Sequence, residues 1–443
     1  MREELITAIV MLLILIGGSA VTRNDKKWSV FFLFLASVAG SLVSGMGIRF
    51  REIAEGPFGF LDSMLCVCAA SVLVAAAERG GVLGLLFERT AKIKNRTLKA
   101  FAVLFLIALP AMLTGFASAS ILTTGKRVRE ALPDRKKAPV IIGVGAFLGV
   151  MFPPNCIPAM IAANGAGSVL PTPYSGFFLP LLILTLPAFI VFAITERAVL
   201  SSVSPVSNAA EISSEGCVYR KKSFWALIVL CITGLAVIID GLFSSVLYPG
   251  GNTLVFFIAS LIEIALSIDF RNSKLGSLKI ALKTIYDGVM NAVVPMSFVF
   301  ALGSFIEVSS MTGFRGLYSL WILPYSPKAV MLVLMVLALF AGYFLSVPIP
   351  ALLAAYAVFP IGWLANTVVV AGCSVVIAVC GLVTRNGGIS CELPCEFSEG
   401  AEIAASGKER LNMLKEARLP VILVLVMGIL MVIFGDRLSF LIM

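Results

Sequence analysis

The sequence predicts an all-α, multi-pass membrane protein built from two inverted repeats, and three observations lead to this fold class. The first is composition: of 443 residues, 59% are apolar and 13% are charged, and the mean hydropathy is +1.01. Soluble chains carry about a quarter charged residues, so the excess apolar surface must face lipid. The second observation is a set of interrupted apolar segments, and the third is the distribution of basic residues.

Composition also excludes several chemistries. The chain has no histidine, which excludes imidazole metal sites, histidine proton relays and Ser-His-Asp catalysis. Its nine cysteines form no C-x-x-C pair and are interpreted as buried thiols. No phosphate-binding Gly-x-x-x-x-Gly-Lys-Ser/Thr motif and no cluster of acid, base and nucleophile occurs on one segment. We therefore expect neither an enzyme nor a cofactor.

The apolar segments divide into simple and interrupted ones. A bilayer core requires roughly 20 apolar residues per helix. Simple spans are predicted at 5–21, 28–47, 60–78, 176–197, 223–243, 253–268, 286–307 and 418–435. Interrupted segments lie at 100–125, 139–168, 328–360 and 368–397. Because backbone amides need partners in lipid, broken helices survive only inside protein or beside water, so these four segments are the expected functional core.

The basic residues predict the topology. Loops 22–27, 87–99, 126–137, 197–222, 269–284 and 391–418 hold 26 of the 34 lysines and arginines. The positive-inside rule places these loops in the cytoplasm, so the net charge of +9 is read as loop bias rather than nucleic-acid binding. Only segment 100–125 separates two of them. We therefore predict that 100–125 is a re-entrant hairpin that turns near Gly115.

An internal repeat accompanies this pattern. Apolar segments that start at 5, 28, 60 and 100 recur at 223, 253, 286 and 328. The first repeat is predicted at 1–200, a cytoplasmic linker at 201–222 and the second repeat at 223–443. Each repeat holds a hairpin and a broken helix and crosses the membrane an odd number of times, so the second is inverted. This architecture is typical of secondary transporters with a site near the midplane.

The first broken helix and hairpin supply candidate ion ligands. Consecutive prolines remove amide donors and leave carbonyls unpaired, which a small cation can use, while the following half-helix directs its positive end to the same place. Small and hydroxyl residues at the hairpin tip allow close approach and provide oxygen atoms. Simpler readings are a proline kink and small residues used for packing. The candidate ion-binding residues are Gly115, Ser118, Ser120, Pro153, Pro154 and Asn155.

The run 113–160 resembles the large permease subunit of TRAP (tripartite ATP-independent periplasmic) transporters, of the DctM-like type. Thr114-Gly115 and the run from Leu148 to Asn155 match that family's tip and Pro-Pro break. Gly342-Tyr343-Phe344-Leu345 is similar to its second hairpin, and Gly381-Leu382-Val383-Thr384 to the start of its second break. Segment order and length also agree, so the resemblance covers essentially the whole chain.

The second half departs from the family pattern. Serine replaces the usual acidic residue of the second hairpin, and Arg385-Asn386 replaces the second Pro-Pro. Arg385 either acts as a fixed charge in place of sodium, meets a substrate carboxylate, or reaches the interface and pairs with a nearby glutamate. A second-half ion or substrate site would comprise Ser346, Thr384, Arg385, Asn386 and Gly387.

The resemblance implies an elevator-type secondary transporter in the inner membrane that imports an organic anion with a sodium gradient. The implied substrates are a C4-dicarboxylate, a sugar acid or a keto acid. The implied partners are membrane lipid, a periplasmic substrate-binding protein and a small permease subunit encoded as a separate chain. Two alternatives stay open: a stand-alone organic-anion symporter of the same superfamily without a binding protein, and a membrane enzyme or transport-inactive membrane protein.

Three glutamates lie in or beside predicted spans. Glu78 and Glu307 occupy equivalent positions of the two repeats and are interpreted as helix-end residues, with a proton relay as the alternative. Glu263 falls inside span 253–268, where a carboxylate is costly. We interpret it as a residue that pairs across a subunit or partner interface.

The hairpin prediction is testable by accessibility labelling. Single cysteines at positions 90–98 and 127–136 of a cysteine-free variant should react with a membrane-impermeant thiol reagent from the same side of the membrane. Labelling of the two sets from opposite sides would contradict the re-entrant hairpin and the inverted repeat.

Overall fold

The computed structural model describes residues 2–18, 28–134, 137–165, 176–203, 216–243, 251–267, 274–345, 349–358, 366–382 and 407–438. Within these ranges the regular structure is helical, without strands. Six described helices are long and apolar enough to cross a membrane: Phe50–Arg79, Arg96–Thr114, Phe178–Thr195, Ser223–Leu242, Pro327–Phe344 and Ala417–Phe434. Ser277–Val293 and Pro295–Met311 add a seventh if they count as one span. The protein is therefore an all-α, polytopic membrane protein.

The helices pack into two compact units. Unit 1 comprises Met1–Met64, Cys156–Thr185 and Val294–Met443, and unit 2 comprises Leu65–Asn155 and Leu186–Val293. Each unit therefore takes segments from both expected repeats, 1–200 and 223–443. Three helices, α5 (Leu61–Arg79), α12 (Phe178–Thr195) and α16 (Lys274–Met311), run through the boundaries and contribute to both units.

Unit 2 holds the first hairpin and the first half of the first broken helix. Within it α7 packs against α10, and α14 packs against α15. Its helices besides the shared ones are α6 (Val82–Ala91), α7 (Arg96–Thr114), α8 (Ala117–Ser120), the π-helical turn η3 (Ile121–Gly125), α9 (Lys126–Ala131), α10 (Ala138–Met151), α13 (Arg197–Leu200), α14 (Gly216–Leu242) and α15 (Gly251–Ser267).

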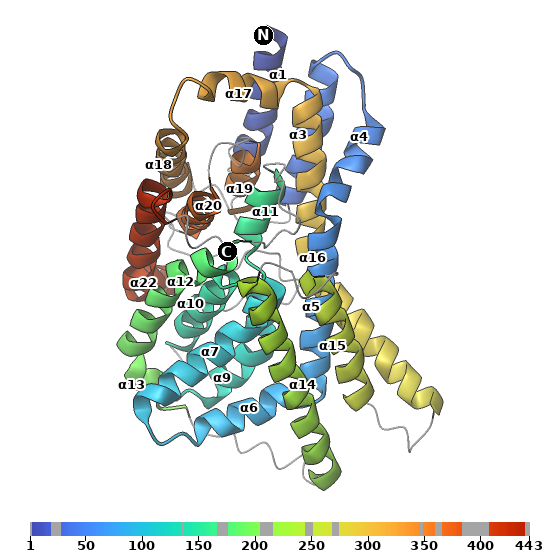
Figure 1. Ribbon diagram of the computed structural model, residues 1–443, viewed down its shortest axis with the longest axis vertical. Helices are drawn as coiled ribbons and strands as arrows, with labels where there is room; N and C mark the ends of the chain where they lie inside the picture. The colour runs from blue at the N-terminus through green and yellow to red at the C-terminus, as the bar shows by residue number, and fades with distance from the viewer. Residues whose placement is uncertain are drawn as a thin grey trace. The chain divides into compact units, whose positions relative to one another are not determined.

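The chain reverses direction at the end of α7 (Figure 1). Helix α7 begins after Asn95, whose side-chain oxygen accepts hydrogen bonds from the amides of Thr97 and Leu98 and so caps the helix. It ends at Gly115, which has a φ of 76°, in the left-handed region that glycine adopts without strain. Both α8 and η3 then pack back against α7. The turn lies where the basic loops predicted it, and the side of the membrane that each arm faces stays a prediction.

Glycines allow α10 to approach α7 closely. A Cβ atom at Gly149 would overlap the carbonyl oxygen of Ala108 and lie 2.9 Å from the Cβ of Ala111. One turn earlier, a Cβ at Gly145 would lie 2.8 Å from a methyl carbon of Ile107. Every residue of α10 is buried, as expected for a helix that is apolar on all sides and lies inside a bundle.

Unit 1 contains the N-terminal helices and most of the second half of the chain. Within this unit α1 packs against α3, α20 packs against α22, α18 and α19, and α11 packs against both α19 and α20 (Figure 1). A Cβ at Gly372 of α20 would lie 2.8 Å from the carbonyl oxygen of Gly428 in α22, so a glycine contact recurs there. The helices are α1 (Arg2–Leu12), η1 (Leu13–Gly17), α3 (Trp28–Val43), α4 (Phe50–Glu55), η2 (Gly56–Phe60), α11 (Ile157–Gly165), α17 (Phe314–Ile322), α18 (Pro327–Leu345), α19 (Ile349–Ala357), α20 (Thr367–Leu382) and α22 (Gly407–Phe434).

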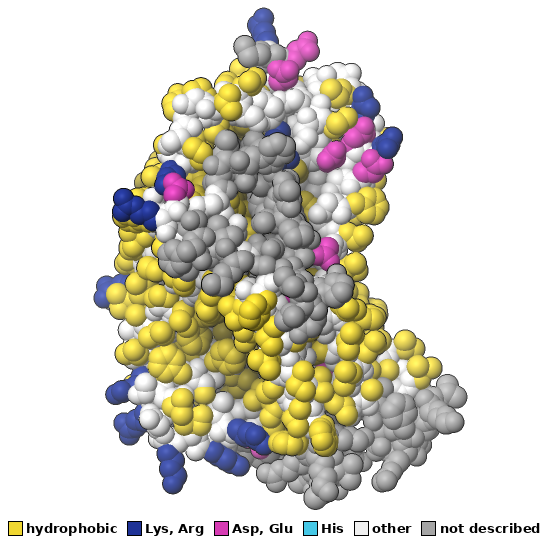
Figure 2. Space-filling model, in the orientation of Figure 1, with side chains coloured by type: hydrophobic (Ala, Val, Ile, Leu, Met, Phe, Trp, Pro, Cys, Tyr) yellow, Lys and Arg dark blue, Asp and Glu magenta, His cyan; other side chains and the backbone are white. Residues whose placement is uncertain are grey.

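Hydrophobic side chains cover much of the described surface (Figure 2). On α14 these exposed residues include Ile232, Leu235 and Ile238, and on α15 they include Phe257, Leu261 and Ile262. Side chains of this kind on the outside of a helix are expected where the surrounding solvent is lipid.

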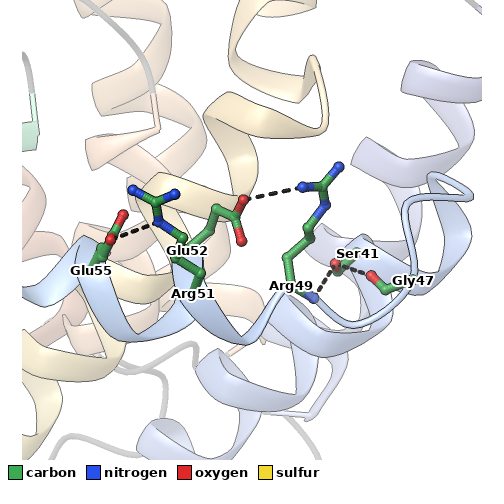
Figure 3. Close-up of polar contacts among 6 residues, drawn as sticks. All are labelled: Ser41, Gly47, Arg49, Arg51, Glu52 and Glu55. Carbon is green, nitrogen blue, oxygen red and sulfur yellow. Dashed lines mark hydrogen bonds and ion pairs between the residues drawn. The ribbon is translucent and has the colours of Figure 1, made fainter.

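The loop between α3 and α4 shows how the chain satisfies polar groups at a helix start (Figure 3). The hydroxyl of Ser41 donates to the Gly47 carbonyl and accepts from the amide of Arg49. Along α4, Arg49 pairs with Glu52 at 3.3 Å and Arg51 pairs with Glu55 at 2.8 Å. These exposed pairs contribute little stability, but they orient two arginines that lie outside the basic loops.

The close contact between α10 and α7 predicts a strong effect of adding one methyl group. We expect Gly149→Ala to lower the free energy of unfolding by about 1–3 kcal/mol, because the new Cβ meets backbone rather than a flexible side chain. Thermal unfolding of the purified protein in detergent measures this effect. Gly234→Ala in α14 is the matched control, since nothing lies within 4 Å of its Cβ position. Equal unfolding midpoints for the two variants would contradict the close packing.

Candidate functional site

The tip of the first hairpin is held by its own hydrogen bonds. The amide of Gly115 donates to the Ala111 carbonyl at 2.7 Å. The hydroxyl of Thr114 donates to the Pro110 carbonyl at 2.8 Å and accepts from the amide of Phe116 at 3.3 Å. The amides of Gly115 and Phe116 are therefore both paired within the chain, as a reversal inside a membrane requires.

The two arms of the hairpin are joined by a buried serine. Ser120 is fully buried, and its hydroxyl oxygen accepts a hydrogen bond from the amide of Ala111 at 2.8 Å. Two of the predicted tip ligands are serines of the short helix α8. Ser120 is buried against the opposite arm of the hairpin, whereas Ser118 is only half-buried. Gly115 and Ser120 both bond to the backbone of Ala111, so the hydroxyl of Ser120 helps to fix the turn.

The first broken helix is interrupted where the prolines predicted it. Helix α10 ends at Met151, and Phe152 is extended, with a ψ of 145°, because the residue before a proline avoids helical geometry. The amide of Phe152 still donates to the carbonyls of Leu148 and Gly149. Pro153 and Pro154 are both buried, and the peptide bond between them is cis. Helix α11 begins at Ile157 and belongs to unit 1.

Asn155 connects the break to the hairpin. Its side chain is fully buried, and its Nδ2 donates to the carbonyl oxygen of Leu113, in the last turn of α7. Its Oδ1 accepts a hydrogen bond from the thiol of Cys66 in α5, with an Sγ–Oδ1 distance of 3.4 Å. We call this contact of Asn155 with Leu113 and Cys66 the Asn155 bridge. It pairs one of the carbonyls that a helix end leaves without an intrahelical partner.

The atoms around the bridge are mostly neutral oxygens. The Leu113 carbonyl, the Asn155 amide oxygen and the hydroxyl of Thr114 are all buried, and a thiol is only a weak donor to the amide oxygen. Among the described residues no group of three or more cysteine and acidic side chains is placed to hold a metal ion. Neutral oxygens without carboxylates suit a singly charged hard cation better than a divalent metal.

The predicted second-half site lies outside the described residues. This applies to Ser346, Thr384, Arg385, Asn386 and Gly387. The described residues on either side of it are helical: Gly342 lies inside α18, which continues to Leu345, and α20 ends at Leu382.

Two short helices of unit 1, α11 and α19, both begin with Ile-Pro-Ala and pack against each other and against α20 (Figure 1). Proline suits the first turn of a helix, where its missing amide is not needed.

Sequence reasoning missed two members of the Asn155 bridge. Cys66 was interpreted only as a buried thiol, and it lies 89 residues from Asn155 in the chain. Leu113 contributes through its backbone, so its side chain carries no signal. The separate interpretation that the cysteines are buried is wrong for Cys231, which is exposed on α14.

No family model and no curated protein matches this sequence. The fold, in contrast, is similar to that of solved transporters. The YdaH transporter of Alcanivorax borkumensis aligns with a TM-score of 0.58 and 12% identity, over 93% of this chain and 98% of that one. MtrF of Neisseria gonorrhoeae, described as illuminating a class of antimetabolite efflux pumps, aligns with a TM-score of 0.53 and 12% identity, over 93% and 95%. The chain therefore has the fold of a membrane transporter.

The Asn155 bridge predicts that removing its two side chains has unequal effects on stability. Asn155→Ala leaves the Leu113 carbonyl buried and unpaired, so we expect it to lower the free energy of unfolding by about 1–2 kcal/mol. Cys66→Ala removes only a weak donor and should have a much smaller effect. Thermal unfolding in detergent measures both. If the two variants unfold at the same temperature, the bond to the Leu113 carbonyl does not hold the break to the hairpin.

Proposed function

We propose that this protein is a secondary transporter of the bacterial inner membrane that moves an organic anion together with a sodium ion. The Asn155 bridge carries this proposal, because it joins a broken helix to the tip of a helical hairpin through buried neutral oxygens. Irregular backbone of this kind inside a membrane protein is characteristic of transporter binding sites. The sodium ion is proposed to bind among Gly115, Thr114 and the 153–155 break.

The proposed inverted repeat is supported by the recurrence of local structure. A long helix is followed in both halves by a left-handed glycine and a short helix. Gly81 has a φ of 74° before α6, and Gly313 has a φ of 75° before α17. The helical order after these points is also parallel, with a 19-residue helix next in each half, α7 and α18. In the proposed elevator mechanism, these repeated elements carry the substrate between the two sides of the membrane.

We favour a transporter that works as a single chain, without a separate binding protein or small permease. The similar solved structures align over 95% or more of their own chains and are described as a transporter and an efflux pump. The resemblance to the TRAP large permease rests on short motifs around Gly115 and Pro153. Those motifs make a TRAP large subunit, with a binding protein and a small permease as partners, the second candidate.

Uptake into proteoliposomes tests the proposed function. The purified protein should accumulate at least one of radiolabelled succinate, gluconate or pyruvate when an inward sodium gradient is imposed. Equal uptake with sodium replaced by potassium would contradict sodium coupling, and no uptake of any of the three anions would contradict the proposed substrate class. Uptake that appears only after a periplasmic binding protein is added would favour the TRAP candidate.

The Asn155 bridge should be required for the response to sodium. We expect Asn155→Ala to abolish the sodium-dependent part of the uptake, because the amide oxygen is a proposed ligand and the bridge fixes the Leu113 carbonyl. Cys66→Ala is the matched control, since it changes the same bridge without removing a cation ligand. Sodium-dependent uptake by Asn155→Ala at the wild-type rate would contradict the proposed site.

A further inference from the structure

Helix α15 carries a buried carboxyl that the proposed site does not use. The buried residues of α15 follow helical spacing, and α14 packs along this helix. Three of them are polar: Asn252, Ser260 and Glu263. The hydroxyl of Ser260 donates to the carbonyl of Phe257, so it is paired within its own helix. Glu263 lies one turn before the helix ends at Ser267.

The surroundings of Glu263 are apolar. Its exposed fraction is 0%, and neither carboxyl oxygen has a hydrogen-bond partner among the described residues. The next residue, Ile264, packs in a cluster with Val72 and Ala76 of α5, against which Ile285 and Val289 of α16 also pack. Because Glu263 is buried inside its own chain, the interpretation that it pairs across a subunit or partner interface is wrong.

Among the described residues, no charged side chain pairs with this carboxyl. On the parts of α5, α14 and α16 that belong to unit 2, the titratable side chains that the structure describes are Cys231 and Asp240 of α14, Cys66, Cys68, Glu78 and Arg79 of α5, and Lys279, Lys283, Tyr286 and Asp287 of α16, whereas Asp62 of α5 and Glu307 of α16 belong to unit 1. The α16 members are exposed, Arg79 donates to Thr284, and Asp240 lies near the opposite end of the α14–α15 pair. None of them forms an ion pair or a hydrogen bond with Glu263 within the described part of the chain.

An ionised carboxylate without a partner is very unfavourable in such a place, whereas the neutral acid is tolerated. We propose that Glu263 is a proton-binding site, whose carboxyl holds a proton in this conformation and releases it when water reaches the core formed by α5, α14, α15 and α16. The bound proton is the ligand, and only the O–H bond of the carboxyl forms or breaks. Its use as a second coupling ion rests on the proposed transport function.

Infrared spectroscopy of the purified protein tests the proton site without any transport assay. The spectrum of wild type minus that of Glu263→Gln at neutral pH should contain the C=O stretch of a protonated carboxyl. Glu55→Gln is the control, because Glu55 is exposed and paired with Arg51, so its difference spectrum should contain carboxylate bands. Carboxylate bands in the Glu263 difference spectrum would overturn the proposal.

The unfolding midpoints of two different Glu263 variants supply a second test of the proton site. Both Glu263→Gln and Glu263→Leu replace a neutral, unbonded acid by a neutral side chain of similar size, so both should unfold within a few degrees of wild type. A large drop in the unfolding midpoint of both variants would show that Glu263 has a charged partner, and would overturn the proposal. This readout, like the infrared one, is independent of substrate.

The coupling role is tested with whichever anion the uptake assay identifies. An imposed pH gradient should change the uptake rate of wild type, and Glu263→Gln should lose that response while it still exchanges internal for external anion. An unchanged response in Glu263→Gln would overturn the coupling role. If wild type transports nothing, the proposed function fails, while the infrared result still decides whether Glu263 binds a proton.

Discussion

The requirement that every backbone amide and carbonyl has a partner inside lipid governs this structure. A continuous helix meets this requirement by itself, but a helix that ends or breaks within the membrane leaves carbonyls unpaired. The chain interrupts its helices at Gly115 and at Pro153, and each interruption is repaired locally, by Thr114 and Ser120 at the turn and by Asn155 at the break. The side chains that repair the backbone are the same ones that supply oxygen atoms to the proposed cation site.

Close contact between helices depends on glycine in both units. Gly149 packs against the backbone of α7, Gly372 against Gly428, and Gly303 against Pro57, whose Cα would lie 2.7 Å from an added Cβ. Without a hydrophobic force to drive helices together in lipid, such contacts gain their stability from van der Waals packing at short range. In unit 2 this contact packs α10, the helix that ends at the break, directly against α7, the first arm of the hairpin.

Much of the helical organisation was predictable from the sequence, because it follows from apolar run lengths, prolines and basic loops. The turn at Gly115 and the break at Pro153 are examples, since each has a local backbone cause. The partner of Asn155 was not predictable, because Cys66 is distant in the chain and Leu113 acts through its carbonyl. Glu263 was placed at an interface because apolar periodicity alone does not distinguish a lipid-facing position from one covered by a neighbouring helix.

The side-chain amide of Asn155 already donates a hydrogen bond to the Leu113 carbonyl, and this bond affects how a cation can bind to that oxygen. A positive ion that takes the lone pairs of that oxygen competes with the amide hydrogen of Asn155. Ion binding at this oxygen and breakage of the bond are then linked, and the linkage is reciprocal: breaking the bond raises the affinity of the carbonyl oxygen for the ion by the same factor by which the bound ion favours the broken bond. If sodium binds at the proposed site, a single amide group makes the bond between the break and the hairpin depend on the sodium concentration.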